Sequence, residues 1–180
     1  MTAYYVDTSA LIKRYVDEVG SGWLRATLNV QPPPSIIVVH LIIVEVTSAL
    51  MRRVREGTLT LMDYAQVQNA FRADCLNEYE LVTAIGDIID QANHLLEQHP
   101  LRAYDAIHLA TAVIANQQLL ANNFAPLTFL SADDRLNRAA TAEGLAVDNP
   151  NDDSAEKGQK PSADKADEAG EYETKSAQSA

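Results

Sequence analysis

The sequence predicts an α/β fold in which a mainly parallel sheet is covered by helices on both faces. Short apolar segments with strand character alternate along the chain with longer segments of helical periodicity, as is typical of parallel sheets. In addition, the apolar run at residues 35–39 follows three prolines and shows no alternation of polar and apolar residues. Such a run is expected of a strand that is buried on both faces.

Local signals give the individual elements. Pro32–Pro34 break the chain before the second strand, Gly57 ends a long helix, and Pro100 ends another. The predicted strands are residues 3–6, 35–39, 80–84 and 127–130, with a short edge strand at 145–147. The predicted helices are residues 8–18, a stretch that follows Ser21–Gly22, and residues 41–55, 61–78, 87–98, 102–120 and 134–143.

Composition divides the 180 residues into a body, residues 1–147, and a tail, residues 148–180. The tail contains nine acidic residues and four lysines but no Val, Ile, Leu, Phe, Met or Trp. Because it cannot bury enough apolar surface to offset its ordering entropy, we expect it to be disordered. It would keep the protein in solution or, alternatively, recruit a partner.

Charge and cysteine content exclude several classes of protein. With 25 acidic against 14 basic residues, the formal net charge is −11, which excludes a simple basic nucleic-acid coat protein. The single cysteine, Cys75, excludes an intramolecular disulfide and a multi-cysteine zinc site. No apolar run reaches the ~18 residues of a membrane span, and the N-terminus does not resemble a signal peptide. We therefore expect a cytoplasmic protein that does not associate with a membrane.

Four acidic residues lie where acids are unusual. Asp7 and Asp133 follow the first and fourth strands, Glu45 interrupts an apolar segment, and Asp105 lies near the start of an apolar helix. The carboxyl ends of parallel strands share one edge, where open α/β folds bind ligands. Each acid also has a structural interpretation, since Asp7 and Asp133 could cap helices and Asp105 could oppose a helix dipole. Glu45 is harder to explain in this way, because buried carboxylates rarely lack partners.

Taken together, the four acids favour a metal site. Two carboxylates ~5 Å apart repel by roughly 3 kcal/mol at an effective dielectric of 20. Four at one crevice would therefore raise one another's pKa values unless a cation lay among them. Oxygen ligands without a cysteine cluster select a hard ion, Mg²⁺ or Mn²⁺. Such ions bind phosphates and activate water for phosphodiester cleavage.

Four passages give the chain a specific resemblance. In their order and spacing it resembles the PIN-domain ribonucleases and, among them, the VapC-type toxins of bacterial toxin–antitoxin pairs. The resemblance covers nearly all of residues 3–147. The passages are Tyr5–Leu11, Val44–Leu50, Tyr104–Ala110 and Leu130–Leu136.

The resemblance implies a PIN-like three-layer α/β/α sandwich and a Mg²⁺-dependent endoribonuclease that acts as the toxin of a type II pair. Its acidic quartet would be Asp7, Glu45, Asp105 and Asp133, with Asp134 as the alternative fourth acid. The active-site hydroxyl would belong to Thr8 or Ser9. The resemblance further implies a homodimer and a small VapB-like antitoxin whose C-terminal segment covers the acidic crevice.

Basic residues and histidine complete the set of candidates. Arg52 shares a helix face with Glu45 and could hold a substrate phosphate, although a solvated helix end explains it equally well. His108 follows Asp105 by one turn, and we expect an ordinary semi-buried histidine and not a general base. The basic residues that could offset the acidity of the chain toward RNA are Lys13, Arg14, Arg52, Arg53 and Arg55.

Two other functions remain open at this point. One is a structure-specific DNA nuclease that uses the same acids, although no helical arch or additional DNA-binding module is visible in the sequence. The other is a catalytically inactive PIN-like binding module, against which the intact quartet argues.

Overall fold

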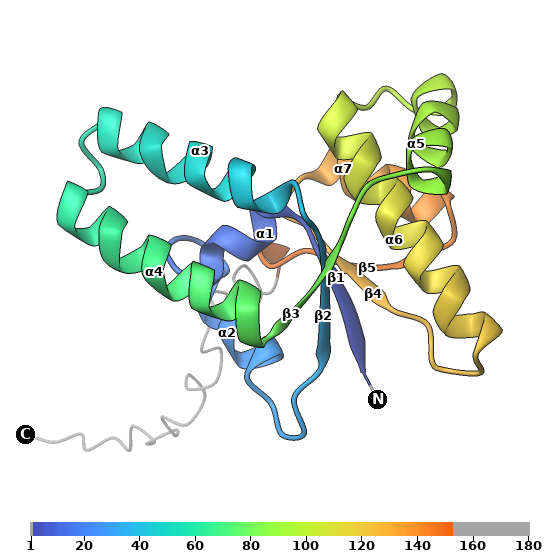
Figure 1. Cartoon of the computed structure of the whole chain (residues 1–180), viewed down its shortest axis with the longest axis horizontal. Coiled ribbons are helices and arrows are strands. Elements are labelled where there is room, and N and C mark those ends of the chain that lie inside the picture. Colours follow the sequence, from blue (N-terminus) through green and yellow to red (C-terminus); the bar gives the residue numbers. More distant parts are fainter. Residues whose placement is uncertain (1, 153–180) are drawn as a thin grey trace, which may run out of the picture.

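A parallel sheet of five strands forms the centre of the molecule (Figure 1). The computed structural model describes residues 2–152. The strand order is β3-β2-β1-β4-β5, and every neighbouring pair is parallel. The strands are β1 (Ala3–Val6), β2 (Ser35–Val39), β3 (Tyr79–Val82), β4 (Thr128–Leu130) and β5 (Ala146–Asp148). The predicted parallel sheet is thus confirmed.

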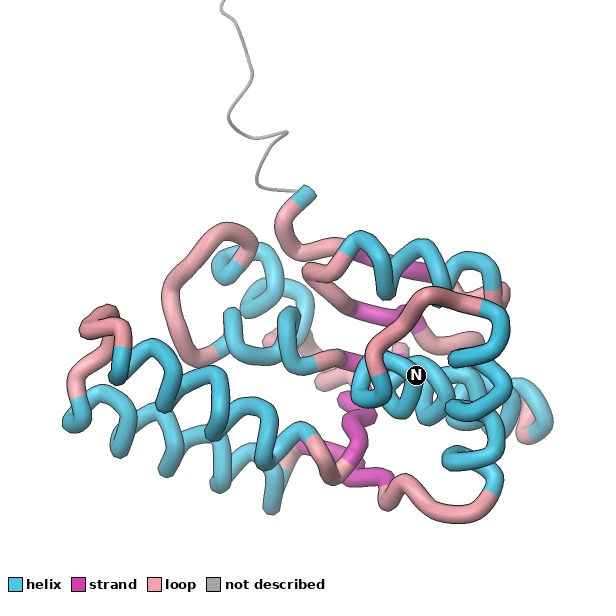
Figure 2. Tube along the Cα trace, turned by 90° about the horizontal axis from the view of Figure 1, so that it is seen from above, coloured by secondary structure: helices cyan, strands magenta, loops and turns pink. Residues whose placement is uncertain are grey.

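Helices cover both faces of this sheet, so the predicted three-layer arrangement is also confirmed (Figures 1 and 2). One core packs strand residues such as Val6 and Val38 against the first four helices. The other packs Tyr5 and Phe129 against the last three. The first group is α1 (Thr8–Leu11), α2 (Ser21–Leu28), α3 (Ile42–Arg55) and α4 (Leu61–Asn77); the second is α5 (Asp87–Gln98), α6 (Ala103–Ala121) and α7 (Asp134–Ala142).

Helices α3 and α4 lie side by side as a pair that extends beyond the sheet (Figures 1 and 2). The side chain of Thr60 accepts a hydrogen bond from the backbone N–H of Asp63 and begins α4. The first turn of α3 lies next to the sheet and carries Glu45, whereas Arg52 lies in its last turn. The two residues therefore share a helix but differ in their distance from the sheet.

The helix expected over residues 8–18 is shorter than the sequence predicted. Helix α1 ends at Leu11, and a 3₁₀ turn, η1 (Ile12–Arg14), follows it. The buried Lys13 side chain donates hydrogen bonds to the Val19 carbonyl and to Glu18, 2.8 and 2.9 Å away. These bonds turn the chain back on itself, and the helical periodicity therefore does not continue to residue 18.

The structured chain continues at least to Asp152, beyond the boundary at residue 147 that composition indicated. Asp148 belongs to β5 and pairs with Leu130. The Asn149 side chain donates to Asp134, and the buried Pro150 packs against Gly20. Gly20 has a φ of 84°, and a Cβ there would lie 2.3 Å from the Pro150 carbonyl oxygen. The remainder of the acidic tail, residues 153–180, lies outside the described residues.

Within residues 2–152, none of the helices combines the length and the apolar character that crossing a membrane requires.

Candidate active site

All four predicted acids lie at the carboxyl edge of the sheet. Asp7 directly follows β1, and its side chain caps α1. Asp133 follows β4 and caps α7. Glu45 lies in the first turn of α3, which follows β2, and Asp105 lies in the first turn of α6. The capping interpretations of Asp7 and Asp133 are therefore correct as geometry, and both residues also belong to the acidic edge.

Asp7 is the most deeply buried of the four, with 6% of its surface exposed. Its Oδ1 accepts hydrogen bonds from the Ala10 backbone N–H at 3.0 Å and from Ser9 Oγ at 2.9 Å. Burial nevertheless raises the pKa of Asp7, and these hydrogen bonds only partly oppose the effect. The ionised carboxylate is therefore disfavoured in its site, and a neighbouring cation would stabilise it.

Two serines join the ends of β1 and β4. Ser9 Oγ accepts a hydrogen bond from the Ala132 N–H at 2.9 Å and lies 3.3 Å from Ser131 Oγ. Ser131 Oγ in turn accepts a bond from the Asp133 N–H at 3.1 Å. The loop that carries Asp133 is thus fixed relative to Asp7. The sequence analysis did not single out Ser131, whose only signal is its place two residues before Asp133.

Glu45 is held by two donors from other elements. Its Oε2 accepts from Thr8 Oγ1 at 2.7 Å and from His108 Nε2 at 2.6 Å. Burial by itself raises the pKa of Glu45, but the hydrogen bonds from His108 and Thr8 outweigh it and lower the pKa. Both predicted hydroxyls therefore contact the acids: Thr8 contacts Glu45, and Ser9 contacts Asp7.

His108 is buried, and both of its ring nitrogens are engaged. Nδ1 lies 2.9 Å from the Tyr5 hydroxyl. In the neutral tautomer that has its proton on Nε2, the ring donates to Glu45 through Nε2, and the Tyr5 hydroxyl donates to Nδ1. This tautomer assignment follows from the hydrogen bonds. His108 thus fixes the position of Glu45 and is not placed as a free general base. The sequence analysis treated it as an ordinary semi-buried histidine and missed this contact, which spans 63 residues of the chain.

Arg135 links the other two acids. Its Nη2 donates to Asp105 Oδ2 at 2.6 Å and lies 3.7 Å from Asp133 Oδ2. Asp133 Oδ1 also accepts from the backbone N–H groups of Arg135 and Leu136, at 2.8 and 3.2 Å. The sequence analysis did not identify Arg135, because nothing in a local pattern shows that its side chain reaches α6.

The donor set suits a hard divalent ion, since it consists of carboxylates and hydroxyls without a thiol. In the arrangement of residues 2–152, no three Asp, Glu, His or Cys side chains lie close enough together to hold a metal. Instead, hydrogen bonds through Ser9, Ser131 and Arg135 join Asp7, Asp133 and Asp105, and Glu45 is held separately by Thr8 and His108. The chemistry of the site fits a metal, while a guanidinium supplies positive charge to Asp105 and Asp133.

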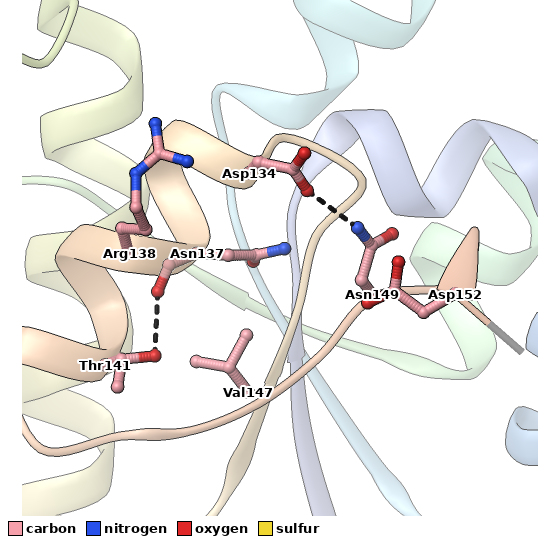
Figure 3. Close-up of a pocket in the computed structure, with 7 residues that line it drawn as sticks. All are labelled: Asp134, Asn137, Arg138, Thr141, Val147, Asn149 and Asp152. Carbon is pink, nitrogen blue, oxygen red and sulfur yellow. Dashed lines mark hydrogen bonds between the residues drawn. The ribbon is translucent and has the colours of Figure 1, made fainter.

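Asp134 points toward Asn149, the residue that follows β5 (Figure 3). Its Oδ1 accepts from Asn149 Nδ2 at 3.0 Å, and it lines a groove of about 460 Å³ between α7 and β5 (Figure 3). Asn137, on the same side of α7, donates to the Ser131 carbonyl. Of the two neighbouring acids, Asp133 is the one whose side chain lies near Arg135, which also binds Asp105.

Three of the five expected basic residues are engaged within the chain. Lys13 pairs with Glu18 at 2.9 Å, Arg53 pairs with the same Glu18, and Arg14 pairs with Glu78 at 2.5 Å. Arg52 and Arg55 are exposed and form no ion pair with the described residues. Arg52 lies two turns from Glu45, about 10 Å along the helix axis.

Comparison with known proteins identifies the fold. Residues 4–142 match the PIN domain family. Ribonuclease VapC46 of Mycobacterium tuberculosis is 33% identical over 147 residues, which cover 82% of this chain and 97% of that protein.

Solved structures give the same result. FitAcB from Neisseria gonorrhoeae has a TM-score of 0.57 at 13% identity and covers 82% of this chain and 97% of that one. VapC20 of Mycobacterium tuberculosis, a toxin that cleaves the sarcin–ricin loop, has a TM-score of 0.54 at 17% identity and covers 79% and 96%. At these identities the structures show the fold alone. Together with the family match and the VapC46 relative, they place the chain: it belongs to the PIN-domain family and, within it, to the VapC-type ribonucleases.

Proposed function

We propose that this protein is a Mg²⁺-dependent endoribonuclease and the toxin of a type II toxin–antitoxin pair. One observation carries the proposal: Asp7, Glu45, Asp105 and Asp133 come from four separate elements to one edge of the sheet. Nucleases of this family are generally metal-dependent. The VapC46 relative is named a ribonuclease, and the VapC20 toxin acts on RNA, which favours RNA as the substrate.

The four acids would hold Mg²⁺, or Mn²⁺ in its place. When bound, the ion would orient the scissile phosphate and lower the pKa of an attacking water. Asp7 provides a buried carboxylate whose raised pKa favours a neighbouring cation. Glu45 is kept ionised and fixed in position by His108 and Thr8. Asp133 is directed by its helix cap, and Asp105 is held by the side chain of Arg135 and by a 3.3 Å bond from the Arg102 N–H.

RNA must approach a chain whose net charge is −11. The bound ion would offset part of this repulsion. Arg52 and Arg55, which are exposed and have no ion pair in the described part of the chain, could hold phosphates next to the cleaved bond. Lys13, Arg14 and Arg53 are less suited to this role because their charges are already paired.

The partner would be a small VapB-like antitoxin that covers the acidic edge. Two of the similar solved structures are described as a toxin–antitoxin complex from Klebsiella pneumoniae and as VapBC2 from Rickettsia felis bound to promoter DNA. An acidic crevice would favour a basic side chain from such a partner. We further propose that the toxin forms a homodimer.

A cleavage assay tests the proposed activity. The full chain is incubated with labelled single-stranded RNA, and in parallel with single-stranded and branched DNA, in Mg²⁺ and in EDTA. We expect internal cleavage of RNA in Mg²⁺ and none in EDTA. Cleavage of branched DNA alone would favour the structure-specific DNA nuclease. If no nucleic acid were cleaved with Mg²⁺ or Mn²⁺, the protein would instead be an inactive binding module.

A further inference from the structure

The acidic edge already contains a cation that belongs to the chain itself. Arg135 Nη2 lies 2.6 Å from Asp105 Oδ2 and 3.7 Å from Asp133 Oδ2. Two of the four acids therefore face the same guanidinium nitrogen. The positive charge reduces the repulsion between carboxylates that would otherwise face each other without a counterion.

The guanidinium is incompletely satisfied in this position. Arg135 Nε is buried and has no hydrogen-bond partner among the described residues. Among the described residues, the Arg135 side chain makes one hydrogen bond, from Nη2 to Asp105. The guanidinium therefore does not bind a carboxylate through two parallel N–H groups. A guanidinium that turned outward would regain these hydrogen bonds from water. About a third of the side chain is already exposed, which leaves a path to solvent.

The Asp105 carboxylate is held by few hydrogen bonds in the described part of the chain. Among residues 2–152, it accepts one further hydrogen bond besides that from Arg135, the 3.3 Å bond from the Arg102 backbone N–H. While the pair with Arg135 persists, the quartet does not bring three acids within metal-holding distance in the described part of the chain. A metal ion that used Asp105 and Asp133 as ligands would need the same carboxylates that face Arg135.

We propose that Arg135 is an internal counterion that competes with the metal ion for Asp105 and Asp133, so that the ion pair and the bound metal exclude each other. The proposal rests on the proposed function, because it takes the quartet as the metal site. Its consequence is a lowered metal affinity. If the paired state holds nine-tenths of the metal-free molecules, the apparent Kd for the metal is weaker by about tenfold.

A Mn²⁺ titration tests the competition without relying on catalysis. The full chain is stripped with EDTA, desalted at pH 7.5 and 0.15 M salt, and titrated while free Mn²⁺ is measured by its electron paramagnetic resonance signal. The Asp7→Asn protein defines the background from acids outside the site. Arg135→Gln removes the counterion, and Arg135→Lys keeps the charge but loses the guanidinium geometry. Arg138→Gln, on the same helix, removes an equal charge from a residue that has no ion pair with the described residues.

We expect Arg135→Gln to bind Mn²⁺ about fivefold to tenfold more tightly than the wild type. Arg135→Lys should lie between the two, and Arg138→Gln should differ from the wild type by less than about twofold because its charge is screened. In EDTA, Arg135→Gln should melt below the wild type, and saturating Mn²⁺ should reduce the difference.

Three results would overturn the proposal. If the wild type binds Mn²⁺ and Arg135→Gln binds it equally or more weakly, Arg135 supports the site and does not compete, while the proposed function stands. If Arg138→Gln tightens binding as much as Arg135→Gln, the effect is one of net charge alone. If neither the wild type nor any Arg135 variant binds above the Asp7→Asn background, the metal site itself is absent and the proposed function fails too. Should Arg135→Gln unfold, Arg135→Lys decides instead: it must bind Mn²⁺ more tightly than the wild type, and equal or weaker binding overturns the proposal.

Discussion

Asp7 shows how one side chain can satisfy both a structural and a chemical interpretation. Its carboxylate caps α1 through the Ala10 N–H, as an ordinary helix cap would. Burial of its charge does not strengthen a helix cap, whereas a buried carboxylate that binds a metal is stabilised by the cation. Burial raises the pKa of Asp7, so a neighbouring cation would stabilise its charged form.

Asp7→Asn should therefore stabilise the metal-free protein, or at least not destabilise it, at neutral pH. Asparagine keeps the cap and removes a charge whose ionised form is disfavoured. A raised folded-state pKa costs stability as the pH rises above the unfolded value near 3.8, and the cost is complete once the pH exceeds the folded-state pKa. The advantage of the variant should thus be greatest at neutral pH and vanish below about pH 3.8. Thermal melting in EDTA between pH 3 and 8 measures this.

Asp134→Asn is the matched control, because Asp134 lines the groove between α7 and β5 and an asparagine there can still bond to Asn149. Its melting difference should stay small at all of these pH values. A wild type that melts above Asp7→Asn in EDTA at pH 7 would contradict the account of Asp7.

His108 gives a second prediction at the same scale. His108→Leu removes the donor to Glu45 and leaves the buried Tyr5 hydroxyl without its acceptor. The free energy of unfolding should fall by roughly 1–3 kcal/mol, the cost of an unsatisfied buried polar group. His108→Gln can still donate to Glu45 and should recover part of the loss. Denaturant unfolding in EDTA measures both, and equal losses for Leu and Gln would show that packing alone matters.

At the scale of elements, residues 148–150 are held by short contacts that composition does not reveal. Asp148 extends β5, Asn149 bonds to α7, and Pro150 packs on the turn before α2. The sequence marks the loss of apolar residues after Val147, but backbone pairing and a single proline need no apolar run.

Two truncations separate these contacts from the rest of the tail. A chain that ends at Asp152 keeps the contacts described for Asp148, Asn149 and Pro150, and its melting midpoint should stay within about 2 °C of the full chain. A chain that ends at Val147 loses all three contacts and should melt at least about 4 °C lower, the shift expected for roughly 1–2 kcal/mol at this size. Equal midpoints for the two truncations would show that residues 148–152 do not contribute to stability.

For the whole molecule, the fold and the acids were predictable, whereas the contacts among side chains were not. Alternating strands and helices, and the positions of Asp7 and Asp133 after strands, are local signals, which explains why these two acids could be found. The bond from His108 to Glu45 and the ion pair of Arg135 with Asp105 join residues 63 and 30 positions apart. Such pairs depend on how the helices pack on the sheet, and this packing cannot be predicted from a local sequence pattern.

The assembly can also be tested as a whole. The gene next to this one should encode a short antitoxin that binds the toxin. When the two proteins are co-expressed, they should elute together in size-exclusion chromatography, and the complex should lose the Mg²⁺-dependent cleavage activity. A toxin that elutes alone from every such co-expression would remove the toxin–antitoxin assignment and leave the nuclease assignment in place.

The central claim is that the acids at the carboxyl edge of the sheet form one metal-dependent site for cutting RNA. Single-turnover cleavage of RNA in Mg²⁺ tests it most directly, with the wild type, Asp7→Asn, Asp105→Asn and the control Asp134→Asn compared side by side. A metal supplies several kcal/mol to the transition state, so each site variant should lose about a hundredfold or more in rate, while Asp134→Asn retains its activity. Wild-type cleavage by Asp7→Asn would contradict the claim.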